Sequence, residues 1–92
     1  MTISETNHKL TLYQFDMCPF CVKVKNYMDQ NSIQIPMKDI LTDSQAKLEL
    51  LEIGGKTQVP CLVIDGKALY ESDDIINWLK QNYSEQNYSE QN

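Results

Sequence analysis

Hydrophobic and polar positions alternate along four short stretches and predict four strands, at residues 9–15, within 33–40, at 61–64 and at 67–70. The first stretch is apolar enough on both faces to lie inside a sheet. The second contains Pro36, which favours a sheet edge because proline cannot donate a ladder hydrogen bond. Asp65 and Gly66 separate the last two stretches and are typical of a two-residue hairpin turn.

Three other stretches repeat their apolar positions at helical spacing. Residues 19–31 predict an amphipathic helix of about three turns. A second helix is capped by Thr42 or Ser44 and stopped by a pair of glycines. Ser72 opens a third helix, with two aspartates in its first turn, where the helix dipole favours negative charge. The predicted order of elements is β-α-β-α-β-β-α, which is an α/β fold.

Both ends of the chain are polar. Residues 1–8 form a polar leader, and residues 82–92 repeat the pentamer NYSEQ without an apolar stripe. Such a composition cannot bury enough surface to order itself, so we expect a disordered repeat tail over residues 83–92. The folded domain is expected over residues 9–82.

Composition and charge narrow the class of protein. A chain of 92 residues suffices for one domain with a modest core. The chain has 8 lysines and no arginine against 13 acidic residues. Its net charge of -5 leaves no broad basic surface for binding nucleic acid. The start is polar where a signal peptide would be basic and then apolar, and no apolar run approaches the roughly 18 residues of a membrane span. We therefore expect a cytoplasmic monomer with no nucleic-acid or membrane partner.

Cys18 and Cys21, in the sequence CPFC, are the candidate reactive residues. The first strand ends near Phe15 and the helix begins at Pro19, a favoured residue at a first helical position, which sets Cys18 at the N-cap. Free N–H groups and the helix dipole favour a thiolate there, so Cys18 is the candidate nucleophile. Cys21 lies three residues on, near the Cα separation that a disulfide needs, and is the candidate resolving thiol.

Two other uses of this cysteine pair are open. A structural zinc ion normally needs four ligands, and beyond the pair the chain offers only Cys61 and His8, so no metal is expected. A structural disulfide across four residues would constrain the unfolded chain little and would be reduced in the cytosol. Redox chemistry leads these alternatives. Cys61 heads an apolar strand and is interpreted as a small buried hydrophobe.

The motif CPFC after a first strand, TQVP before a third, and an acidic helix start after the hairpin resemble a glutaredoxin over residues 9–82. The resemblance implies a thioredoxin-like fold, in which a four-stranded mixed sheet is flanked by three helices. It also implies that Pro60 is in the cis form beside the active cysteine. Glutathione is the implied reductant, held partly by backbone pairing with Val59.

The resemblance carries over to other residues one by one. Lys56, four residues before the proline, matches a basic position that helps to hold the glycine carboxylate of glutathione, although a solvated loop lysine is an equal reading. The stretch YESDD departs from the glutaredoxin pattern and looks more like the first domain of glutathione transferases. There, Glu71 and Ser72 would take the γ-glutamyl carboxylate and Asp73 or Asp74 the ammonium, while a plain capped helix start fits the same residues. Phe20 stands where a tyrosine is commonest.

The resemblance thus implies a dithiol glutaredoxin that reduces glutathione mixed disulfides and disulfide-containing proteins. Cys18 attacks, and Cys21 resolves the mixed disulfides formed with proteins. Three alternatives are open: a redoxin reduced by thioredoxin reductase, a non-catalytic glutathione-binding module like the first domain of a transferase, and a subunit that shares an iron-sulfur cluster. Proline after the first cysteine is a poor fit to the last of these.

Overall fold

The computed structural model describes residues 8–82, so the expected leader at 1–7 and the expected tail at 83–92 lie outside the described residues. The elements follow the predicted order β-α-β-α-β-β-α: β1 (Leu10–Gln14), α1 (Pro19–Gln30), β2 (Met37–Asp39), α2 (Ser44–Gly54), β3 (Cys61–Ile64), β4 (Lys67–Tyr70) and α3 (Ser72–Asn82).

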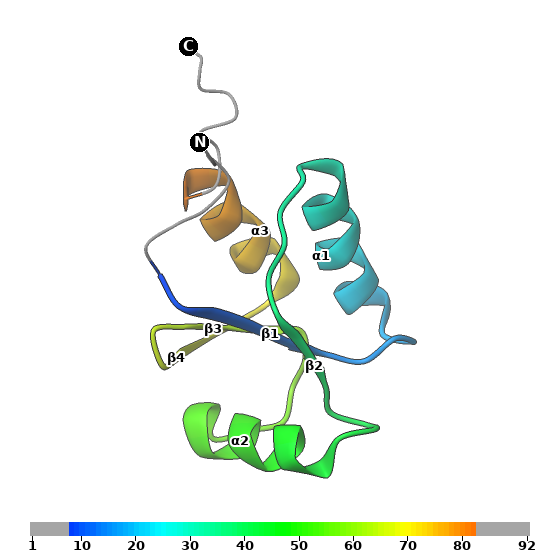
Figure 1. Cartoon of the computed structure of the whole chain (residues 1–92), viewed down its shortest axis with the longest axis vertical. Helices are drawn as coiled ribbons and strands as arrows, with labels where there is room; N and C mark the ends of the chain where they lie inside the picture. Colours follow the sequence, from blue (N-terminus) through cyan, green and yellow to red (C-terminus); the bar gives the residue numbers. More distant parts are fainter. Residues whose placement is uncertain (1–7, 83–92) are drawn as a thin grey trace.

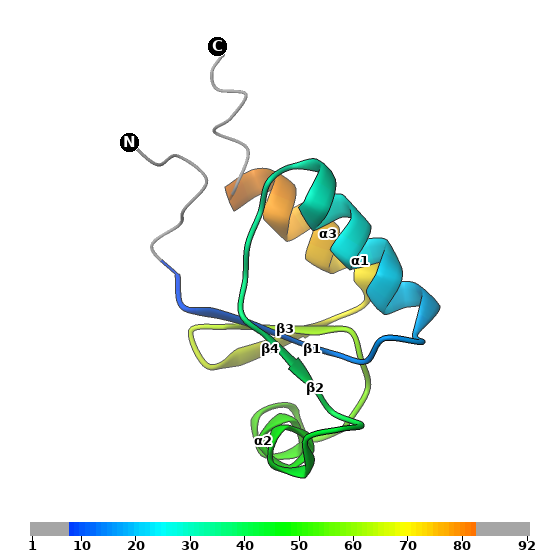
Figure 2. The ribbon, with the colours of Figure 1, turned by 45° about the vertical axis from the view of Figure 1, so that its right-hand side comes forward.

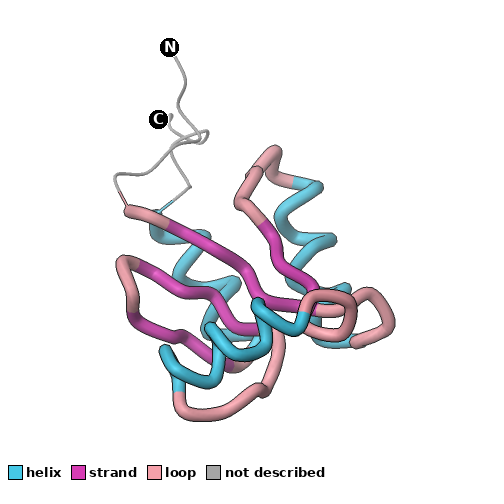
Figure 3. Tube along the Cα trace, turned by 60° about the horizontal axis from the view of Figure 1, so that its bottom comes forward, coloured by secondary structure: helices cyan, strands magenta, loops and turns pink. Residues whose placement is uncertain are grey.

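The four strands form one mixed sheet in the order β2-β1-β3-β4. β2 runs parallel to β1, whereas β3 is antiparallel to both β1 and β4. Helices α1 and α3 lie side by side on one face of the sheet and α2 covers the other (Figures 1 and 2). Figure 3 shows the strands in magenta between these layers. The expected four-stranded mixed sheet with three flanking helices is confirmed, as is the edge position of the strand that follows Pro36.

Each face of the sheet carries its own hydrophobic cluster. Under α1 and α3, the fully buried side chains are Leu12, Val24, Leu62, Ile75 and Leu79. Under α2, the cluster contains Tyr13, Ile40, Ala46, Leu50, Cys61 and Val63. Cys61 is fully buried, which confirms its interpretation as a small hydrophobe of the core. The two clusters use alternate residues of β1 and β3, because successive side chains of a strand point to opposite faces.

The predicted cap of α2 is wrong. Neither Thr42 nor Ser44 caps the helix; Asp43 is the N-cap, and its carboxylate accepts hydrogen bonds from the N–H groups of Gln45 and Ala46, at 3.0 and 3.3 Å. All three residue types suit a cap, so local sequence does not choose among them. The preceding turn makes this choice. The side chain of Asp39 accepts hydrogen bonds from the N–H groups of residues 41 and 42, so the N-cap falls on the next residue, Asp43.

Left-handed residues end β3 and α2, as predicted. Asp65 and Gly66 have φ of 51° and 86°, the pair of positive values that a type I′ hairpin turn requires. Gly55 has φ of 82° and caps the C-terminus of α2, donating its N–H to the carbonyl of Leu51. Among the described helices, none is long and apolar enough to cross a membrane.

Candidate active site

Cys18 is the N-cap of α1, as the sequence predicts. Its backbone is extended, with φ of -78° and ψ of 119°, and its sulfur accepts a hydrogen bond from the N–H of Cys21 at 3.4 Å. Pro19 follows at the first helical position, where no N–H partner is lost. The sulfur therefore faces the unpaired N–H groups and the positive end of the helix dipole, the setting that stabilises a thiolate.

Cys21 differs from Cys18 in its exposure. It is fully buried one turn into the helix, while 7% of Cys18 remains exposed. Burial, and then the hydrogen bond with Cys18, raise the pKa of the Cys21 thiol to about 12. Both cysteines are free thiols in this structure. A protonated thiol is a poor nucleophile, so the raised pKa of Cys21 leaves Cys18 as the candidate for the first attack.

The loop before β3 reaches the same sulfur. The bond between Val59 and Pro60 is cis, as the resemblance implies. The carbonyl of Val59 accepts a hydrogen bond from the Cys18 thiol at 3.9 Å. Residues that lie 41 positions apart in the chain thus meet at the N-terminus of α1.

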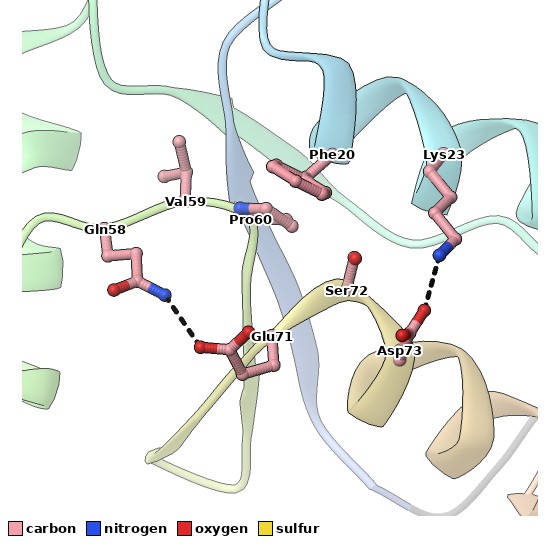
Figure 4. A pocket seen from close by; sticks show the side chains of 8 residues that line it. All are labelled: Phe20, Lys23, Gln58, Val59, Pro60, Glu71, Ser72 and Asp73. Carbon is pink, nitrogen blue, oxygen red and sulfur yellow. Dashed lines mark hydrogen bonds and ion pairs between the residues drawn. The ribbon is translucent and has the colours of Figure 1, made fainter.

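A cavity of about 350 Å³ opens beside this loop (Figure 4). It is lined by Phe20, Lys23, Gln58, Val59, Pro60, Glu71, Ser72 and Asp73. They come from three places: the first turns of α1, the loop before β3, and the start of α3. Six of them are residues that the sequence singled out, and the structure brings these six together in one cavity.

Lys56 lies elsewhere. Its ammonium sits 4.4 Å from the centre of the Tyr70 ring, a cation–π contact, and it does not line the cavity. The hydroxyl of Tyr70 donates a hydrogen bond to the carbonyl of Lys56 at 3.1 Å, so Tyr70 contacts both the backbone and the ammonium of Lys56. In this structure the side chain is therefore engaged with the hairpin.

Two residues of the cavity, Lys23 and Gln58, were missed as site residues. Lys23 forms an ion pair with Asp73, with 2.5 Å between Nζ and Oδ1, and Gln58 donates to the carboxylate of Glu71 at 3.4 Å (Figure 4). A sequence signal existed for Lys23, because it lies three residues after Phe20 and so shares its helix face. For Gln58 the signal was its place inside TQVP.

The far end of the cavity is the N-terminus of α3. The carbonyl of Glu71 accepts the first helical hydrogen bond, from the N–H of Ile75, and Ser72 is the first helical residue. The N–H groups of this first turn have no partner within the helix and suit an anion. Asp73 and Glu71 beside them suit a cation. The cavity therefore offers groups that suit both signs of charge at the start of α3, and Val59, which also lines it, contacts the sulfur of Cys18.

Among the described residues, no group of three or more His, Cys, Asp or Glu side chains is placed to hold a metal ion. Burial raises the pKa of the Cys61 thiol to about 11, and its side chain lies in the core under α2.

Comparisons with known proteins support the fold and the family. The family model described as the N-terminal domain of glutathione S-transferase matches residues 12–87. The chain is similar to glutaredoxin 1 of Rickettsia prowazekii (strain Madrid E), with 27% identity over 77 residues that cover 80% of each chain. It is also similar to prostaglandin E synthase 2 of Danio rerio, with 34% identity over 77 residues, 83% of this chain but only 20% of that protein.

Among solved structures, a mutant form of the thioredoxin-like protein BC3987 superposes with a TM-score of 0.70 and 29% identity, over 83% of this chain and 95% of that one. The expected thioredoxin-like fold is confirmed. The family-model match over residues 12–87 spans the first turns of α1, the loop before β3 and the start of α3, which line the cavity.

Proposed function

Because this chain belongs to the family of the glutathione S-transferase N-terminal domain and is similar to glutaredoxins, we propose that it is a glutathione-dependent thiol-disulfide oxidoreductase. Its proposed substrates are glutathionylated and disulfide-containing proteins, in a reducing compartment such as the cytoplasm. One observation carries the proposal: the sulfur of Cys18 caps a helix N-terminus and contacts the carbonyl of Val59, beside a cavity that ends at a second helix N-terminus.

We propose that the cavity binds glutathione in an extended form. The backbone of Val59 pairs with the cysteine residue of glutathione, next to Pro60. The γ-glutamyl carboxylate lies at the first turn of α3, at Ser72, and the carboxylates of Asp73 and Glu71 attract its ammonium. Lys56 is proposed as the partner of the glycine carboxylate, and this requires its side chain to leave the ring of Tyr70.

In the proposed reaction the Cys18 thiolate attacks the glutathionyl sulfur of a mixed disulfide. The substrate leaves as a thiol after taking up a proton, and Cys18 remains joined to glutathione. A second glutathione thiolate attacks this bond, which releases oxidised glutathione and restores Cys18. When the substrate is a protein disulfide, Cys21 attacks the mixed disulfide and leaves an oxidised pair with Cys18.

The test is turnover of a glutathionylated peptide with glutathione as reductant, by the natural chain and by Cys18→Ser, Cys21→Ser and Cys61→Ala. We expect Cys18→Ser to lose activity and Cys21→Ser to keep it, because the cycle needs one thiol. Cys61→Ala is the matched control, since it removes a cysteine that lies in the core under α2.

Each remaining outcome has one meaning. If none of the four chains turns over the peptide, the proposal is wrong. Glutathione binding without turnover would then indicate a binding module like the first domain of a transferase, as the family match allows. Turnover with thioredoxin reductase in place of glutathione would indicate a redoxin served by that enzyme.

A further inference from the structure

Lys25 lies on α1 after the cysteine pair, and the proposed cycle assigns it no role. It lies one helical turn after Cys21 on α1, and only 24% of its side chain is exposed. Its ammonium donates a hydrogen bond to the side-chain oxygen of Gln14 at 2.7 Å, and it lies 3.5 Å from a carboxylate oxygen of Asp16. Gln14 itself is buried, with 6% exposed, so this is a built contact rather than a solvated lysine.

The two side-chain partners of Lys25 lie on either side of Phe15. Phe15 lies between Gln14 and Asp16, and its backbone lowers the pKa of the Cys21 thiol. Phe15 also accepts the N–H of Cys18, at 3.3 Å, through its carbonyl. Lys25 therefore ties the end of β1 and the loop after it to the helix that carries both cysteines, and it holds a positive charge on the helix face of Cys21.

We propose that Lys25 is the positioning residue of the resolving step: its anchored ammonium stabilises the thiolate of Cys21 and thereby sets how fast a mixed disulfide on Cys18 closes into the Cys18–Cys21 disulfide. This inference rests on the dithiol part of the proposed function. It concerns Cys21, which lies four residues before Lys25 on α1, whereas Cys18 lies seven residues before it.

The step conserves atoms and electrons. The Cys21 thiol gives its proton to solvent, and the sulfur electron pair forms a bond to Sγ of Cys18. The bond between Cys18 and the substrate sulfur breaks, and the departing thiolate takes up a proton. No external oxidant is needed, because the substrate disulfide is the species reduced.

Burial of Cys21 slows this step because it disfavours the thiolate that must attack. Burial and the neighbouring Cys18 raise the pKa of Cys21, while the Phe15 backbone and the charge of Lys25 lower it; these are the groups that act on the sulfur. A buried thiolate has little solvent to stabilise it, so a fixed cation on the same helix face favours it. Lys23, on the same helix, is directed into the cavity, where its ammonium pairs with Asp73 (Figure 4).

The experiment separates the two sulfur steps with Ellman's reagent, an aromatic disulfide whose thiolate product is coloured. The reaction of Cys18 releases a first thionitrobenzoate, and the attack of Cys21 on the new mixed disulfide releases a second. Cys21→Ser must give the first release only. The full chain is compared with Lys25→Met, which keeps the stem without the charge, with Lys25→Arg, and with Lys47→Met, which removes one lysine from an exposed position of α2.

We expect the second release to be about three- to tenfold slower in Lys25→Met, because the lower thiolate fraction outweighs the gain in nucleophilicity. The rise of its rate with pH should shift to higher pH by about one unit. The first release should change less than about twofold, Lys25→Arg should restore the second, and Lys47→Met should match the natural chain.

Two results would overturn the inference: an unchanged second release in Lys25→Met, or equal slowing of both releases with a lower unfolding temperature, which is the mark of a purely structural tether. The proposed function fails separately. If the natural chain shows no glutathione turnover but Lys25→Met still slows only the second release, glutathione is the wrong reductant and the role of Lys25 stands.

Discussion

At the residue scale, position in the fold separates three thiols that composition treats alike. Burial raises the pKa of Cys21 to about 12 and that of Cys61 to about 11, whereas Cys18 lies at a helix N-terminus. The thiolate is the reactive form, and below the pKa its fraction falls tenfold per pH unit. The folded chain should therefore react selectively with alkylating agents.

We predict that iodoacetamide at pH 7.5 labels Cys18 and leaves Cys21 and Cys61 unlabelled. Between pH 8 and pH 10 the thiolate fractions of the two buried thiols rise about 100-fold, so their labelling should rise with pH. Mass spectrometry of the digested protein measures this, with labelling in urea as the control for all three sites. Cys21 reacting as fast as Cys18 at pH 7.5 would show that the assigned roles are wrong.

A second residue, Gly54, has no room for a side chain. A Cβ atom there would lie 1.8 Å from the Tyr70 hydroxyl oxygen and 3.1 Å from Cβ of Ala68. Gly54→Ala must displace the ring of Tyr70, and with it the hydrogen bond to the carbonyl of Lys56.

We predict that Gly54→Ala lowers the free energy of unfolding by about 1–3 kcal/mol, measured by urea denaturation. Tyr70→Phe removes the closest clashing atom, so the double variant should be more stable than the sum of the two single changes implies. Strict additivity in this cycle would contradict the proposed clash.

At the element scale, α2 depends on a cap that its own sequence does not single out. Asp43 accepts two of the first N–H groups of the helix, while Thr42 and Ser44 flank it. We predict that Asp43→Ala lowers the free energy of unfolding by about 1 kcal/mol, because it leaves those donors without a side-chain partner. Urea denaturation measures the change.

Thr42→Ala and Ser44→Ala are matched controls for that cap, since each removes a hydroxyl one position away. Both should change the free energy of unfolding by less than about 0.5 kcal/mol. If either control lowered the free energy of unfolding more than Asp43→Ala does, that control residue rather than Asp43 would be the cap.

At the scale of the whole molecule, the sheet joins two clusters that do not touch. Leu50 belongs to the cluster under α2, and Trp78 packs against the cluster under α1 and α3. Because β1 and β3 contribute to both clusters, loss of one face should weaken the other.

We predict that Leu50→Ala lowers the free energy of unfolding by about 2–5 kcal/mol and that the molecule still unfolds in a single transition. Trp78 fluorescence reports the far face and circular dichroism reports the helices and strands, and their midpoints should coincide. Two separate midpoints would mean that the faces unfold independently.

Much of this molecule is determined by its sequence, because the signals are local. Strand alternation, helical spacing, the Asp65-Gly66 turn and the proline after Cys18 each act within a few residues, so the element order and the N-cap position of Cys18 were predictable. The resemblance in CPFC and TQVP added the cis proline, since those motifs carry a known arrangement.

Only the tertiary structure decided which side chains meet. In the folded chain Lys23 and Gln58 line the cavity, and the ammonium of Lys56 lies over the ring of Tyr70. Asp43 caps α2, and Lys25 donates a hydrogen bond to Gln14. Each of these depends on the relative placement of segments, and for all but the cap those segments are far apart in the chain. The physical reason is that a local pattern fixes backbone conformation, whereas a long side chain finds its partner only when the whole sheet and its helices have packed.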